Sequence, residues 1–90
     1  MKIFVVIGST GEYSDHQEWL VVAFSDKVVA ERFVLTVSAR ARELLAKYGR
    51  GYNIPKGSNE HDPEMTIDYS GVNYNIAEVE FIDVRVETMK

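Results

Sequence analysis

The sequence has no cysteine, only two prolines among its 90 residues, and no apolar run long enough to cross a membrane. Without cysteine, disulfides, thiolate zinc sites and cysteine nucleophiles are excluded. A membrane helix needs about 20 apolar residues, so we expect no membrane partner. Residues 2–7 carry one lysine and form too short an apolar stretch for a signal peptide. We therefore expect a cytoplasmic protein, in a bacterial or an infected host cell.

Basic residues are also few. Ten Lys and Arg stand against fourteen Asp and Glu, which gives a net charge of −4. Phosphate binding draws its affinity from Lys and Arg, so a nucleic-acid partner is not expected, and the excess of acid is too small for a nucleic-acid mimic. Hydrophobic residues are 46% and charged residues 27% of the chain, as in folded domains. The length predicts a single domain, residues 1–90.

The first half of the chain predicts two strands and a helix. Residues 2–8 and 19–24 are apolar runs rich in β-branched side chains, and such runs are typical of strands. Ser25 precedes an amphipathic pattern over residues 26–48. We therefore expect a helix whose first turn is capped by Ser25 and which ends at Gly49.

The second half predicts a long loop and one more strand. Residues 49–71 hold four of the six glycines and both prolines, which indicates an irregular loop of a length that is often functional. A short strand over residues 65–69 is an alternative within it. From Val72 onward, β-favouring residues return, but their alternation changes phase after Ile76 and again after Phe81. This pattern predicts a bulged strand or two short strands.

This order of elements predicts an α+β fold of the ββαβ type. The first two strands can pair antiparallel, and a crossover containing the helix then returns the last strand parallel to the second. The all-apolar first strand fits best in the middle. We therefore expect a three-stranded, mainly antiparallel sheet with spatial order 2-1-3 and one long helix on one face. A homodimer or a partner protein would cover the sheet face opposite the helix or the two edges of the sheet.

The loop between the first two strands is the main candidate for a binding site. Residues 11–16 combine two carboxylates, a phenol, a hydroxyl and an imidazole, which predicts either a binding site or a structured turn. Trp19 comes directly after this loop, and it is either a core residue or an anchor for a partner. Neighbouring antiparallel strands should bring the turn at 70–71 to the same end of the sheet. The candidate binding residues are Glu12, Tyr13, Ser14, Asp15, His16, Trp19, Tyr69 and Tyr74.

Two alternatives remain open. The acidic segment 59–64 adds a second histidine, and a small metal-dependent or acid–base enzyme would use His16, His61, Asp15 and Asp62. No His-Glu-x-x-His spacing supports a metal, and the spacing gives no Ser-His-Asp triad. We therefore predict no catalytic residue, no metal and no cofactor. Weak nucleic-acid binding is the second alternative, although cations near a helix C-terminus also complement its dipole; its candidate residues are Arg40, Arg42, Lys47, Tyr48, Arg50, Tyr52 and Lys56.

Taken together, these segments resemble small uncharacterised proteins of phages and bacteria. The likeness rests on the opening strand, the motif Gly-Glu-Tyr-Ser-Asp at residues 11–15, the second strand and helix, and the segments at 62–63, 68–69 and 71–80. The chain departs from that pattern at Val28-Val29 and in its longer, more apolar tail. The resemblance transfers no reaction and no catalytic residue. It implies a phage or prophage setting, in which a small protein binds or inhibits a host protein such as a defence system, so we expect a non-enzymatic protein-binding module.

Overall fold

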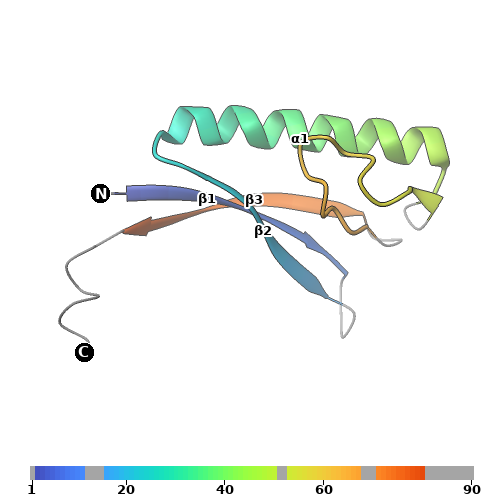
Figure 1. Cartoon of the computed structure of the whole chain (residues 1–90), viewed down its shortest axis with the longest axis horizontal. Helices are drawn as coiled ribbons and strands as arrows, with labels where there is room; N and C mark the ends of the chain where they lie inside the picture. The colour runs from blue at the N-terminus through green and yellow to red at the C-terminus, as the bar shows by residue number, and fades with distance from the viewer. Residues whose placement is uncertain (1, 12–15, 51–52, 68–70, 81–90) are drawn as a thin grey trace.

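The computed structural model describes residues 2–11, 16–50, 53–67 and 71–80. They form strands β1 (Lys2–Thr10) and β2 (Gln17–Phe24), helix α1 (Lys27–Tyr48) and strand β3 (Val72–Glu80). The three strands make one sheet in the order β2-β1-β3, and β1 is antiparallel to both neighbours. Helix α1 lies along one face of the sheet (Figure 1). The predicted ββαβ fold and its strand order are thus confirmed.

Strand β1 is central because it offers apolar side chains to both faces of the sheet. On the α1 side, Phe4 and Val6 are buried, whereas Val5 and Ile7 on the opposite side are only partly buried. The strand does not stop at Gly8, as its glycine suggested, but continues to Thr10. Gly8 therefore belongs to the middle of the sheet.

The cap of helix α1 lies one residue later than predicted. The Asp26 carboxylate accepts hydrogen bonds from the backbone amides of Val28 and Val29, so Asp26 and not Ser25 satisfies the first turn. The end is as predicted: Gly49 has a φ of 77°, and its amide donates to the Leu45 carbonyl. The buried stripe consists of Ala30, Val37, Ala41 and Leu44.

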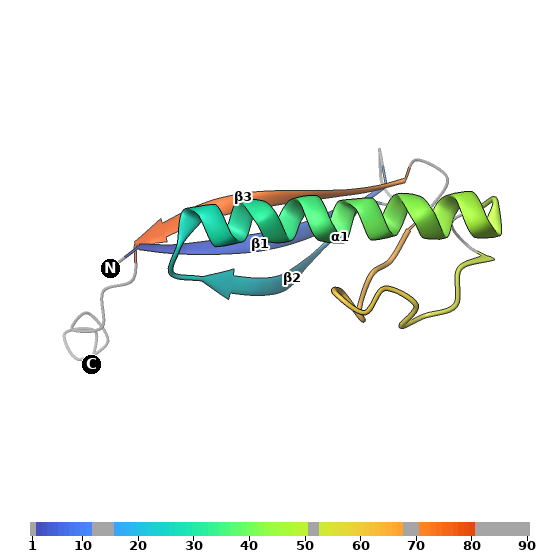
Figure 2. The ribbon, with the colours of Figure 1, turned by 90° about the horizontal axis from the view of Figure 1, so that it is seen from above.

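The layer above the sheet has two parts. Helix α1 packs more closely against β3 than against β1 or β2, and residues 53–67 lie beside it on the β2 side (Figure 2). Met65 is buried in the same core cluster as Val37, and Ile54 and Ile67 pack against that cluster. The irregular loop therefore completes the core instead of extending from it.

Two details of the predicted strands are wrong. Within the described range, β3 pairs with β1 without any register shift, so no bulge follows Ile76. The irregularity lies in β2, where Val22 pairs with Val6 but Leu20 pairs with Ile7, leaving Val21 as an extra residue. Residues 65–67 form no strand, and both residues 68–69 and the predicted phase change after residue 81 lie outside the described residues.

No helix in the part of the chain that the structure describes combines the length and the apolar character that crossing a membrane requires.

Candidate functional site

Two aromatic residues and one carboxylate meet above Gly8. Gly8 pairs with Trp19 on β2 and with Tyr74 on β3. A Cβ atom at Gly8 would lie 2.5 Å from Cε2 of the Trp19 indole, so the glycine allows the ring to lie across the central strand. From the loop above, Asp62 Oδ2 accepts hydrogen bonds from Trp19 Nε1 at 2.9 Å and from the Tyr74 hydroxyl at 2.8 Å.

This Trp19–Asp62–Tyr74 network is buried. Asp62 is 2% exposed and Tyr74 is 7% exposed, whereas Trp19 is partly buried, so removal of the carboxylate would leave the Tyr74 hydroxyl without a partner and without solvent to replace it. The pKa of the Tyr74 hydroxyl is raised well above its ordinary value, first by burial and then by the hydrogen bond to Asp62 and its negative charge. Tyr74 therefore stays a protonated donor at neutral pH, and the network holds the loop onto the sheet.

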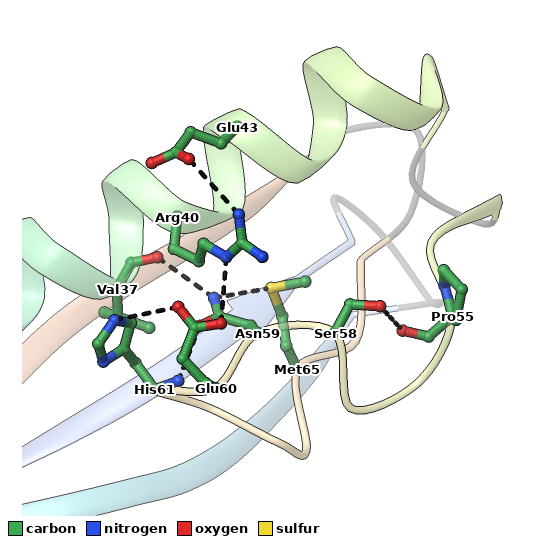
Figure 3. A network of polar contacts seen from close by, with 9 residues as sticks. All are labelled: Val37, Arg40, Glu43, Pro55, Ser58, Asn59, Glu60, His61 and Met65. Carbon is green, nitrogen blue, oxygen red and sulfur yellow. Dashed lines mark hydrogen bonds and ion pairs between the residues drawn. The ribbon is translucent and has the colours of Figure 1, made fainter.

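Asn59 fixes the same loop to the helix. It is 0% exposed, its Nδ2 donates to the Val37 carbonyl at 3.3 Å and lies 3.5 Å from Met65 Sδ, and its Oδ1 accepts from the His61 amide at 3.0 Å (Figure 3). The backbone amide of Asp62 donates to the Asn59 carbonyl at 3.0 Å. Both buried polar residues of this loop are thus hydrogen-bonded, as buried polar groups must be.

A surface ion cluster lies on the solvent side of the loop. Arg40 contacts Glu60 at 3.2 Å and Glu43 at 3.4 Å, and His61 Nε2 lies 3.3 Å from Glu60 (Figure 3). These four residues line a shallow, open hollow beside Leu35. The pKa of Glu60 is lowered, mainly by a backbone hydrogen bond, against a smaller opposing effect of burial and with help from the positive charges of Arg40 and His61.

The predicted binding residues fall into three groups. Glu12, Tyr13, Ser14, Asp15 and Tyr69 lie outside the described residues. His16 lies at the end of the sheet, where Nδ1 is 3.0 Å from the Gly11 carbonyl oxygen and Nε2 is 3.3 Å from Glu18. Trp19 and Tyr74 come together through Asp62 on the α1 side of the sheet.

The predicted meeting of the two turns at one end of the sheet holds for their described flanks. Thr10 pairs with Gln17 on one side and with Val72 on the other. Its hydroxyl donates to the carbonyl of Gly71. The segment that leaves β1 and the segment that enters β3 are therefore neighbours at this end.

The residues of the enzyme alternative have different partners. Asp62 is bound beneath the loop to Trp19 and Tyr74, His61 contacts Glu60 on the surface, and His16 contacts Glu18. Asp15 lies outside the described residues. Among the residues with described positions, no three His, Asp or Glu side chains are grouped in a way that would hold a metal ion.

Two of the basic residues of the nucleic-acid alternative are paired with carboxylates. Arg40 binds two glutamates, and Lys56 lies 3.6 Å from Glu64. Lys47 lies over the ring of Tyr48, 5.3 Å from its centre. Arg42 is exposed and forms no ion pair with any described residue. The ion pairs of Arg40 and Lys56 thus reduce the positive charge that this patch offers to a phosphate backbone.

The sheet face opposite α1 carries an apolar patch that no described residue covers, and it is bordered on the same face by the polar residues Ser9, Glu18, Asn73 and Asn75. Ile7 and Ile3 of β1 pair with Leu20 on β2 and Val79 on β3, and these two flanking side chains are 75% and 46% exposed. Scattered exposed apolar residues are ordinary, but a patch that continues across three strands indicates an interaction surface. We call it the open face, formed by Ile3, Val5, Ile7, Leu20, Ala23, Ala77 and Val79.

The sequence analysis missed Asn59 and Asp62 as buried loop anchors. A glycine inside an apolar strand, two residues before the strand's end, was the available signal, because such a glycine often marks a close approach of another group.

Comparison of the chain with family models, with curated proteins and with solved structures finds no match.

Proposed function

We propose that this chain is a non-enzymatic protein-binding module that contacts its partner through the open face. The observation that carries the proposal is the exposure of Leu20, 75%, and Val79, 46%, on either side of the central β1 residues. The opposite face of the same strand is buried under α1 and the loop. Of the two faces of the described sheet, the open face thus combines apolar side chains from all three strands with access to a partner.

The size of the open face suits a protein contact. Three strands spaced about 4.8 Å apart, each about nine residues long at about 3.3 Å per residue, give the whole sheet face a footprint of roughly 400 Å², and the open face occupies roughly half of it, at the level of residues 3–7 of β1. The largest apolar patch on a typical monomer is roughly 300–600 Å² and is often functional. Burial of a side chain such as that of Leu20 stabilises a complex by about 2 kcal/mol.

The charge distribution specifies the chemistry of the partner. The one charged strand residue beside the open face on the described part of this sheet face is Glu18, near the start of β2, and it contacts His16. A charged group of the partner placed at the centre would lose its hydration without gaining an ion pair. The partner surface is therefore apolar and uncharged at its centre.

The resemblance to phage proteins supplies the setting for this proposal. In that setting the partner is a host protein in the cytoplasm, for example a component of a defence system, and the chain acts by occupying an apolar surface of that protein. The resemblance is an analogy of context. The open face is the physical basis of the proposal.

The test compares two exposed leucines. Leu20 on the open face and Leu35 on α1 are 75% and 70% exposed, so Leu20→Lys and Leu35→Lys change hydrophobicity and charge equally. Host proteins captured by the immobilised wild-type chain are identified, purified and titrated against all three forms by calorimetry. We expect Leu20→Lys to weaken binding at least a hundredfold and Leu35→Lys to leave it within about threefold, with equal melting temperatures.

A captured protein that binds Leu20→Lys as tightly as the wild type would contradict the proposal. So would equal losses in the two variants, because they would place the contact elsewhere.

A further inference from the structure

We propose that the outer edge of β3 pairs antiparallel with β3 of a second copy of this chain. The two sheets then join into one continuous antiparallel sheet with a two-fold axis at Ile76. This inference goes beyond the proposed function, because it uses the backbone edge of β3 and the groove beside it, and leaves the open face free.

Strand β3 is the edge that is suited to pairing. It has β1 as its only neighbour in the described sheet, and its register runs without interruption from Val72 to Glu80. Its outer backbone N–H and C=O groups thus form a regular row that another strand can match. The other edge, β2, contains the extra residue Val21, and such bulges disrupt the pairing of an edge.

The surroundings of β3 leave room for a second strand. Seen from above, β3 runs along the outer side of α1 (Figure 2). A groove lies between α1 and the first half of β3 and is lined mainly by Ser38, Arg42, Leu45, Ile67, Val72 and Tyr74. A strand added beside β3 would extend the sheet below this groove and place its side chains along it.

Pairing about Ile76 uses all nine residues of β3 and gives complementary charges. It places the second copy's Glu78 opposite Tyr74 and its Glu80 opposite Val72. Glu78 and Tyr74 pair with Phe4 and Gly8 on the buried side of β1, so these carboxylates project toward α1, on the side where Arg42 lines the groove.

The charges of the monomer agree with this arrangement. Arg42 forms no ion pair with a described residue, whereas Arg40, two positions earlier, contacts two glutamates. Among the described residues, Glu78 has one ion pair, an exposed contact of its Oε2 with Lys2 at 3.3 Å. No glutamate of β3 lies opposite another glutamate in the pairing, so the acidic strand does not repel its own copy.

The size of the contact sets the expected affinity. Stable interfaces bury about 1,600 Å² in total, and one pair of strands with two Arg–Glu contacts buries less. We therefore expect a reversible dimer that dissociates in the micromolar range.

The absence of native cysteine makes cross-linking specific. Directly opposite residues of antiparallel strands have Cβ atoms about 4.5–5.5 Å apart, close to the distance that a disulfide requires. Under mild oxidation at concentrations above the dissociation constant, Ile76→Cys should give a covalent dimer on a non-reducing gel. Leu20→Cys, more exposed but on β2, should stay mainly monomeric. Equal cross-linking of the two variants, or none for Ile76→Cys, would overturn the inference.

Sedimentation equilibrium of the full chain tests the charge contacts. Arg42→Glu should weaken the dimer at least tenfold. Arg32→Glu changes the charge of the same helix equally, away from the groove lining, and should have no effect. The exchange Arg42→Glu with Glu78→Arg should restore at least half of the lost association. A wild-type chain that is monomeric up to millimolar concentration, or equal losses for the two arginine variants, would contradict this dimer. Neither outcome would change the result expected for Leu20→Lys in the partner test, so the two proposals can fail independently.

Discussion

The two faces of the sheet differ in the kind of contact that neighbouring residues of β1 make on them. On the covered side, Gly8 makes room for Trp19, and the polar groups of Trp19, Tyr74 and Asp62 bind one another. On the open face, Ile7 is flanked by Leu20, and no polar group is buried. The covered face thus requires specific partners for its polar atoms, whereas the open face requires only an apolar surface. The stability of the monomer should depend on the first face and binding on the second.

The largest effect on the stability of the fold is expected from Asp62→Ala, on the covered face. The change leaves the Trp19 indole N–H and the Tyr74 hydroxyl without an acceptor, and each unsatisfied buried group costs about 1–3 kcal/mol. We expect the free energy of unfolding in urea to fall by about 3 kcal/mol.

Two further variants control this measurement. Glu64→Ala removes an exposed carboxylate that contacts Lys56 and should change stability by about 0.5 kcal/mol or less. Asp62→Asn keeps one acceptor oxygen and should therefore lose less unfolding free energy than Asp62→Ala. If Asp62→Ala and Glu64→Ala had similar effects, the loop would not be held by the buried carboxylate.

The next largest effect on stability is expected when two adjacent valines are compared. Val6 is fully buried beneath α1, whereas Val5 is partly exposed on the open face. We expect Val6→Ala to destabilise the fold by about 2 kcal/mol, because it creates a cavity in the core, and Val5→Ala by less than about 1 kcal/mol. Thermal unfolding monitored by circular dichroism measures both. Equal losses in dilute monomeric protein would show that the open face is covered.

The fold was predictable where many residues carry the same signal. The unbroken apolar run of β1 indicated its central position, and the helical stripe with Gly49 behind it indicated the extent of α1. The cap was not determined, because Ser25 and Asp26 are adjacent and both residue types cap helices well. The hydrogen bonds from the Val28 and Val29 amides to the Asp26 carboxylate decide between them, and the sequence pattern does not record these bonds.

The Asp62 network was not predictable for a different reason. In sequence, Asn59 and Asp62 belong to a polar segment with Glu60 and Glu64, and such segments are usually solvated. Their burial depends on how the loop folds over Trp19, which is 43 positions away from Asp62 along the chain. Likewise, the consecutive apolar residues Ile76 and Ala77 suggested a phase change in β3. The strand is regular there, and one residue points to each face of the sheet, because both faces accept apolar side chains.

The smallest expected effect concerns alkaline pH and distinguishes Tyr74 from surface tyrosines. Burial and the Asp62 carboxylate raise the pKa of Tyr74 above its ordinary value of 10.0. An unfolded chain would release this proton above about pH 10 while the folded chain retains it, so the raised pKa contributes stability that is full below pH 10 and declines as pH rises further. Between pH 10 and pH 11 we expect the free energy of unfolding to fall by about 1 kcal/mol through this group. Tyr74→Phe should be less stable at pH 7 but should lose less between these two pH values. An identical alkaline loss in both proteins would show that Tyr74 ionises as freely in the fold as in the unfolded chain.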